Sequence, residues 1–99
     1  IKMAVGDVVS GLSSVASGGY LDIQPPVNNE WIITNIFHEA DVELYFYDGV
    51  NLLKFDSDPA GGVWYNLGIP VTNSRYIRVK NTNAAAKLIG YGGIVSKSA

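Results

Sequence analysis

Hydrophobic and polar positions alternate with a period of two residues along most of the chain after residue 20. Segment 42–47 shows this pattern, with aliphatic and phenylalanine positions alternating with glutamate and tyrosine: Val42, Leu44 and Phe46 against Glu43, Tyr45 and Tyr47. Successive side chains of a β-strand point to opposite faces, so this alternation predicts a half-buried strand. We expect the Val42 side to face the core and the tyrosine side to lie outside.

Turn residues divide the chain into several such segments. Prolines and asparagines follow segment 20–24, the Asp48-Gly49 pair predicts a tight turn of type I′, and residues 56–62, DSDPAGG, predict a loop. The expected strands are residues 20–24, 30–37, 42–47, the return strand of that hairpin to residue 55, 63–69, 75–81 and 86–95. Seven to eight short strands with no convincing helix predict an all-β fold, and we favour an antiparallel, jelly-roll-like β-sandwich.

Some segments also predict which side chains share a face. In residues 30–37 strict alternation places three large side chains together, at Trp31, Ile33 and Phe37. In residues 75–81 it turns two side chains inward, Ile77 and Val79. The last segment carries three glycines, Gly90, Gly92 and Gly93, which predict a bulge or a close approach of two backbones.

The N-terminal segment gives conflicting signals. Its apolar residues fall at helical spacing, at Val5, Val8, Val9, Leu12 and Val15, but glycine, serine and β-branched valine disfavour a helix. A short amphipathic turn, an extended arm lying on its own domain and an arm reaching a neighbouring subunit all fit. We divide the chain into an N-terminal arm, residues 1–19, and a β-sandwich domain, residues 20–99. A partner contact is expected at Val8, Val9 and Leu12.

Composition suggests a partner surface. The 99 residues suffice for one domain, and 47% are hydrophobic while only 16% are charged, against roughly 25% in typical proteins. The net charge is -2, and only Arg75, Arg78 and Lys80 cluster among the basic residues, so no nucleic-acid partner is expected. No apolar run approaches the ~20 residues that cross a bilayer, and no secretion leader is recognisable, so no membrane partner is expected.

Patterns that carry chemistry are weak throughout the sequence. There is no cysteine, and His38 is the only histidine, without a nucleophile motif or a set of zinc ligands beside it. Asp56 and Asp58 resemble the start of a calcium loop, but the later glycine and glutamate of an EF-hand are missing. The acidic residues near position 40 define no pair for glycoside hydrolysis. We expect neither an enzyme nor a bound metal or cofactor.

The aromatic residues are numerous, and three interpretations compete for them. Some complete the core, others could form a coplanar platform for carbohydrate, and others could form a subunit interface. Tyrosine and arginine are enriched at interfaces, and the chain has few charges, so we favour an interface built from Tyr45, Tyr47, Tyr76 and Arg78.

Five motifs together resemble the small β-sandwich structural proteins of tailed-bacteriophage virions: YLDIQPP, NEWIITNI, VELYFYDG, VTNSRYIRVKN and LIGYGGIV. The resemblance spans residues 20 to 95, and its motifs are structural rather than chemical. It implies a capsid decoration (cement) protein located in the virion, or else a tail or fibre component. It also implies a homo-oligomer, with a trimer favoured, a major capsid protein or other virion protein as partner, and no catalytic residues.

Overall fold

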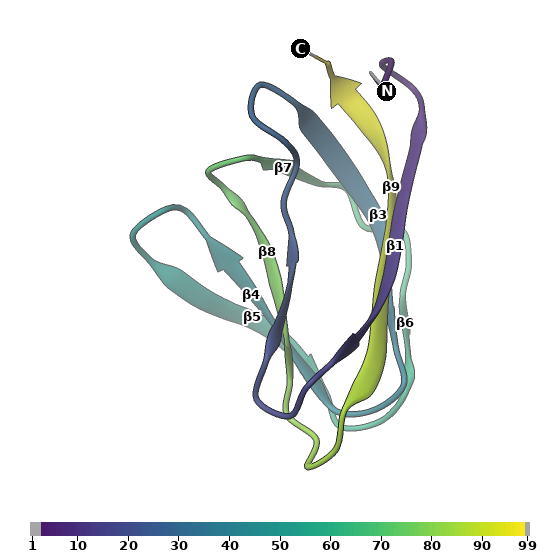
Figure 1. Cartoon of the computed structure of the whole chain (residues 1–99), viewed down its shortest axis with the longest axis vertical. Coiled ribbons are helices and arrows are strands. Elements are labelled where there is room, and N and C mark those ends of the chain that lie inside the picture. Colours follow the sequence, from purple (N-terminus) through teal and green to yellow (C-terminus); the bar gives the residue numbers. More distant parts are fainter. Residues whose placement is uncertain (1–2, 99) are drawn as a thin grey trace.

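A computed structural model describes residues 3–98, which form two antiparallel β-sheets packed face to face (Figure 1). The nine strands are β1 (Val8–Val15), β2 (Tyr20–Ile23), β3 (Glu30–His38), β4 (Val42–Tyr47), β5 (Leu52–Asp58), β6 (Gly62–Trp64), β7 (Ile69–Thr72), β8 (Tyr76–Asn81) and β9 (Lys87–Lys97). No helix occurs in this part of the chain, so none there is long and apolar enough to cross a membrane. The predicted all-β sandwich is confirmed, with nine strands rather than seven to eight.

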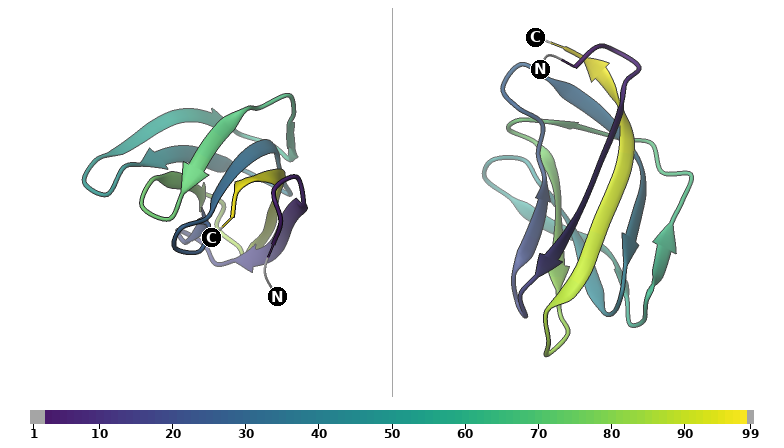
Figure 2. Two further views of the ribbon diagram at one scale, coloured as in Figure 1. Left: turned by 90° about the horizontal axis from the view of Figure 1, so that it is seen from above. Right: turned by 45° about the vertical axis from the view of Figure 1, so that its right-hand side comes forward.

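Strand order identifies the sandwich as jelly-roll-like. The larger sheet runs β1-β9-β3-β6, and β7 pairs with the other half of the same edge of β3. The smaller sheet runs β2-β8-β4-β5. The chain therefore crosses between the sheets at almost every connection, as expected for two interlocked Greek keys. Figure 2 shows the two sheets from above and from the side, with β1 and β9 adjacent along the larger sheet.

The core lies between the facing sides of the two sheets. Aliphatic side chains from both sheets fill it, including Ile23, Ile33, Leu44, Ile77, Val79, Ile89 and Val95. Their alternation along β4 and β8 confirms the predicted inward faces of residues 42–47 and 75–81, although Phe46, near the hairpin end, is only half-buried. Period-two patterning therefore positions the opposite faces of β4 and β8 on the outside of the sandwich.

Strand β3 departs from strict alternation. A register shift against β9 lies between Ile33 and Asn35, so the strand changes phase halfway along its length. Ile36 is fully buried beyond this point, while Phe37 is only half-buried. The prediction that Phe37 shares a face with Ile33 is therefore wrong, because one extra residue at a β-bulge reverses the side chains that follow.

Two glycines of β9, Gly92 and Gly93, lie opposite this bulge. A Cβ atom added at Gly93 would lie 2.3 Å from the carbonyl oxygen of Ile32, on the neighbouring strand. One added at Gly90 would lie 2.2 Å from the ring of Phe37. The predicted close approach of two backbones is confirmed, since β9 passes β3 at distances that only glycine allows, whereas the extra residue of the bulge, Thr34, lies in β3 and not at the glycines of β9.

Residues 8–15 form an integral strand of the sandwich. β1 pairs antiparallel with β9 along its whole length, from Val8 opposite Ile94 to Val15 opposite Lys87. The division between an arm, 1–19, and a sandwich, 20–99, therefore differs from the structure, in which the sandwich begins at β1. Val9 and Val15 point into the core because they are an even number of residues apart, as in a strand. The helical spacing of the apolar residues is coincidental.

The β4–β5 hairpin projects from one side of the molecule (Figure 1). Residues 48–51 connect Tyr47 to its partner Leu52, and Gly49 has a positive φ of 98°. Asp48 does not, so the predicted hairpin is present but its turn is not of type I′. Instead the Asp48 carboxylate accepts hydrogen bonds from the backbone N–H groups of Asn51 and Val50, which hold its pKa at about 2.

Candidate functional site: a tyrosine-arginine face

Four tyrosines and one arginine lie together on the outer face of the smaller sheet. This tyrosine-arginine face consists of Tyr20 on β2, Tyr45 and Tyr47 on β4, and Tyr76 and Arg78 on β8. Strand register brings them together, because Tyr45 lies opposite Arg78 and Tyr47 lies opposite Tyr76. All four residues predicted from the smaller sheet are therefore neighbours. The structure adds Tyr20, which the sequence analysis missed.

Arg78 lies at the centre of this face. Its guanidinium carbon is 4.2 Å from the centroid of the Tyr20 ring and 5.9 Å from that of Tyr47, within the range of cation–π attraction. Its Nε donates to Oδ1 of Asp22 at 2.7 Å, and this hydrogen bond raises the pKa of Arg78 above its usual value. The arginine is thus held in one position by a carboxylate and two rings.

The tyrosine rings pack edge to face. Tyr20 and Tyr45 have centroids 5.9 Å apart at 68°, and Tyr47 and Tyr76 have centroids 5.5 Å apart at 65°. Such tilted pairs are favourable for aromatic rings. They do not form the coplanar platform that the carbohydrate interpretation requires. The surface of the face is instead uneven, because the tilted rings expose edges and hydroxyl groups.

A second polar cluster borders the face. The Tyr45 hydroxyl donates to Oε1 of Glu43 at 2.7 Å, while Nζ of Lys54 on β5 lies 3.5 Å from Oε2 of the same carboxylate. The hydrogen bond to Glu43 raises the pKa of Tyr45 to about 12, and the same bond lowers the pKa of Glu43. Arg78 is paired with Asp22 and Lys54 with Glu43, and Lys80, whose Nζ lies 5.9 Å from the centroid of the Tyr20 ring, adds one positive charge beside them.

Replacing Glu43 by glutamine should make Tyr45 ionise at lower pH. An unfolded tyrosine loses its proton near pH 10, whereas folded Tyr45 keeps it to about pH 12. Between these values the folded state binds more protons, so its contribution to stability falls as the pH rises. Burial also raises the pKa values of Tyr76 and Tyr91, so the test is the difference between the two proteins: in an alkaline titration followed by tyrosinate absorbance, one group of the wild type should ionise earlier in Glu43→Gln. An unchanged titration curve would mean that this hydrogen bond does not form in solution.

The predicted N-terminal contact residues separate onto two sides of β1. Val8 and Leu12 are 75% and 61% exposed and face outward, away from the smaller sheet. Val9 is only 4% exposed, so its side chain belongs to the core and the expectation that it contacts a partner does not fit the structure. None of the three lies near the tyrosine-arginine face, since β1 belongs to the other sheet.

His38 occupies a structural position. Its ring is buried, lies 4.9 Å from the Trp64 ring and contacts the carbonyl oxygen of Ala40 through Nδ1 at 2.7 Å. A carbonyl only accepts, so Nδ1 carries the proton. Nε2 lies 3.4 Å from Oδ2 of Asp58, without a hydrogen bond in this geometry. The end of β3 therefore lies next to the end of β5, which belongs to the other sheet.

The two aspartates considered for calcium are engaged in local structure. Asp56 accepts hydrogen bonds from Nε1 of Trp64 and from the backbone N–H of Ser57. Asp58 accepts one from the backbone N–H of Ala60. Within residues 3–98, no group of three or more His, Cys, Asp or Glu side chains is placed to hold a metal ion.

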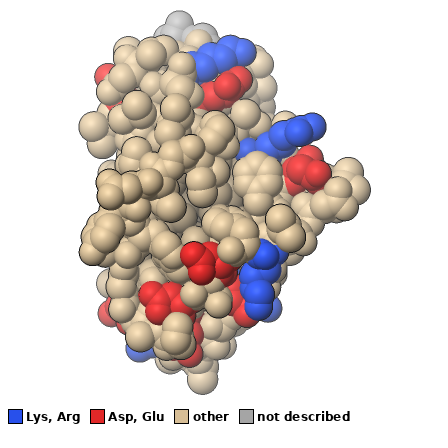
Figure 3. Space-filling view, turned by 180° about the vertical axis from the view of Figure 1, so that it is seen from behind, with Lys and Arg blue, Asp and Glu red and all other residues tan. Residues whose placement is uncertain are grey.

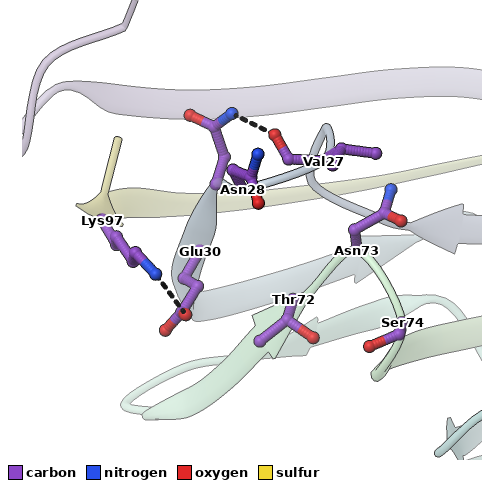
Figure 4. Close-up of a pocket in the computed structure, with 8 residues that line it drawn as sticks. Val27, Asn28, Glu30, Thr72, Asn73, Ser74 and Lys97 are labelled. Carbon is purple, nitrogen blue, oxygen red and sulfur yellow. Dashed lines mark hydrogen bonds and ion pairs between the residues drawn. The ribbon is translucent and has the colours of Figure 1, made fainter. Parts of the chain in front are cut away.

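A polar hollow of about 340 Å³ lies at one end of the sandwich (Figure 4). It is lined by amide, hydroxyl and charged side chains from the segment before β3, from the β7–β8 connection and from the end of β9, including Asn28, Glu30, Thr72, Asn73, Ser74 and Lys97. Much of this lining is already paired: Nζ of Lys97 lies 3.8 Å from Oε2 of Glu30, and Asn73 donates to the carbonyl oxygen of Pro25. Sequence reasoning did not identify this hollow.

The view from behind the molecule shows how the charges are distributed (Figure 3). Basic and acidic side chains on this side lie near the upper end, beside the projecting hairpin and toward the lower end, with the two signs next to each other. The middle of this side, away from the hairpin, is a broad uncharged area. This side therefore lacks the continuous basic patch that a nucleic-acid partner would require.

No protein-family model and no curated protein matches this sequence.

Proposed function

We propose that this chain is a non-enzymatic structural protein of a bacteriophage virion that decorates the capsid and stabilises it by bridging shell subunits. The observation that carries the proposal is the tyrosine-arginine face, an ordered aromatic surface that no element within residues 3–98 covers. The resemblance of its motifs to those of virion structural proteins is the reason for proposing a virion as its location. Catalysis is not part of the proposal.

The geometry of the face suits protein binding. Tyrosine and arginine side chains provide most of the energy at many interfaces, and their contribution is larger when they are already ordered before binding. Here the rings brace one another, and Arg78 is fixed by Asp22 at 2.7 Å. Little side-chain freedom remains to be lost when a partner binds.

Many copies of this protein, each making the same contact on the capsid, would together stabilise the shell. Each copy that binds only the assembled shell favours the assembled state by mass action. If one copy touches two neighbouring subunits, the second contact forms at a high effective concentration. A moderate affinity per contact then strengthens every junction of the shell.

Serine at both Tyr45 and Tyr47 should weaken capsid binding while leaving the fold intact. Removing two central aromatic side chains from an interface typically costs at least ~2 kcal/mol, or about 30-fold in affinity. The measurement is co-sedimentation of purified protein with capsids of the source phage that lack it. Both residues lie on the outer face of β4, so the circular dichroism spectrum should be retained.

Tyr65→Ser provides a matched control, because Tyr65 is 70% exposed and lies outside the face. This variant should bind like the wild type. Equal binding of the double variant and the wild type would refute the role of the tyrosine-arginine face. If the wild type bound tails or fibres instead of capsids, the tyrosine-arginine face would still be the interface, but the protein would belong to the tail or fibre rather than to the capsid.

A further inference from the structure

Three of the four sheet edges carry features that discourage pairing with another strand. Edge strand β5 includes Lys54 and Asp56, and its pairing with β4 has a register shift that leaves Phe55 of β5 without a partner in the ladder. Edge strand β2 has four residues and is soon followed by two prolines. The far edge of the larger sheet is split into the short strands β6 and β7, and β7 contains Pro70. Charge, proline, irregularity and shortness all protect exposed edges.

Strand β1 lacks every one of these features. It is an eight-residue edge strand, VVSGLSSV, with no charged residue, no proline and no register shift against β9. In the described part of the chain, β9 is the only strand that pairs with it. Its outer edge therefore presents unpaired backbone N–H and C=O groups, which is a template for another strand.

The outward side chains beside this edge are also uncharged. Alternation with the buried positions places four residues of β1 and four of β9 on the outer face: Val8, Ser10, Leu12, Ser14, Leu88, Gly90, Gly92 and Ile94. Val8 and Leu12 are the most exposed of the large ones. A surface without charges does not repel a copy of itself, so an identical strand is an electrostatically suitable partner.

We propose that β1 pairs antiparallel with β1 of a second copy of this chain, around a two-fold axis at Ser10. In this register Ser10 of one copy lies opposite Ser10 of the other. Val8 of each copy lies opposite Leu12 of its partner. The two-fold axis therefore creates two equivalent cross-strand pairs, each between a highly exposed Val8 and a highly exposed Leu12. Directly opposed residues of an antiparallel pair share a face, and such apolar pairs stabilise a sheet.

Other registers give poorer pairs. An axis at Gly11 would place Val8 opposite Ser14 and Leu12 opposite Ser10, so each apolar side chain would meet a hydroxyl. A shift by one residue between the strands would turn the outer face of one copy toward the inner face of the other. The axis at Ser10 alone pairs Val8 with Leu12.

This contact is independent of the proposed function. It joins two larger sheets edge to edge and leaves the tyrosine-arginine face of each copy free, because that face belongs to the smaller sheet. The contact is isologous, so it closes after two copies. The free protein is then a dimer rather than the trimer that the family resemblance implies.

The test introduces charge at the axis. Ser10→Lys places two lysines opposite each other, Ser10→Asp places two aspartates, and directly opposed like charges destabilise a sheet. Native mass spectrometry and analytical ultracentrifugation of the full chain over a concentration series should show a dimer for the wild type. Each variant alone should dimerise at least about tenfold more weakly. An equimolar mixture should form the mixed dimer, because lysine then faces aspartate.

Two variants on β9 serve as controls. Ser96→Lys and Leu88→Lys add charge to exposed positions of the same sheet, one strand away from the proposed edge contact, and both should remain dimeric. The inference is overturned if the wild type is monomeric up to its solubility limit or only trimeric, or if the mixture of Ser10 variants does not pair. It is also overturned if Leu88→Lys disrupts the dimer, because that result would indicate face-to-face packing.

Discussion

Replacing Gly93 with alanine is expected to destabilise the protein by at least ~3 kcal/mol, a large fraction of the stability of a small domain. The added Cβ would lie 2.3 Å from the carbonyl oxygen of Ile32 and 3.1 Å from its carbonyl carbon. These are backbone atoms of the central strand β3, so no side chain can move aside to relieve the overlap. β3 and β9 would have to separate, which would disturb the bulge and the core beneath it.

Gly68→Ala is the matched control for this prediction. No heavy atom would come within 4 Å of a Cβ at Gly68, and the residue does not require a positive φ. Its stability should stay within ~1 kcal/mol of the wild type or rise slightly. Urea unfolding curves of both variants measure the difference. If Gly93→Ala lost no more than Gly68→Ala, β9 and β3 would not approach as closely as described.

The second large effect is expected at Asn81, the fully buried polar residue at the end of β8. Its side-chain amide donates at 2.9 Å to the carbonyl oxygens of both Val15 and Ala85, and its Oδ1 accepts from the backbone N–H of Asn83 at 2.9 Å. One side chain thus holds the end of β1 and the connection between β8 and β9. Its hydrogen-bonding capacity is almost fully used.

Asn81→Asp keeps the shape but removes both donations. A carboxylate at neutral pH only accepts, so it would face two carbonyl oxygens as an unpaired buried charge, which typically costs 3–5 kcal/mol. Thermal and urea unfolding should both report the loss. Asn28→Asp makes the same chemical change at an exposed loop residue and should alter stability by less than ~0.5 kcal/mol. Equal stability of the two variants would contradict the buried network.

The sequence pattern predicts the strands well where alternation continues without interruption. Val42 and Leu44, like Ile77 and Val79, occupy the inward positions that a period of two assigns to them. The pattern fails in β3 because the register shift near Asn35 depends on how closely β9 approaches, and that is a tertiary property. β1 was obscured because glycine and serine at several of its positions weaken the strand signal.

The candidate site was predictable only in part, for a related reason. Tyr45 and Tyr47 are assigned to the outer face by their alternation with Leu44, and Tyr76 and Arg78 by their alternation with Ile77. Their proximity depends on β4 and β8 being neighbours, and the recruitment of Tyr20 depends on β2 lying on the other side of β8. Strand order of this kind arises from connections between distant segments, which a local pattern does not encode.

The position of β9 has a consequence for biosynthesis. This strand is the ninth along the chain, yet it lies between β1 and β3 in the larger sheet. A growing polypeptide can therefore not complete that sheet until residues 87–97 have left the ribosome. Until then the apolar sides of β1 and β3 have no strand between them, and the nascent chain is exposed to association with other chains. Formation of the native sheet is expected to be a late event that follows synthesis, with a rate limited by contacts between distant segments.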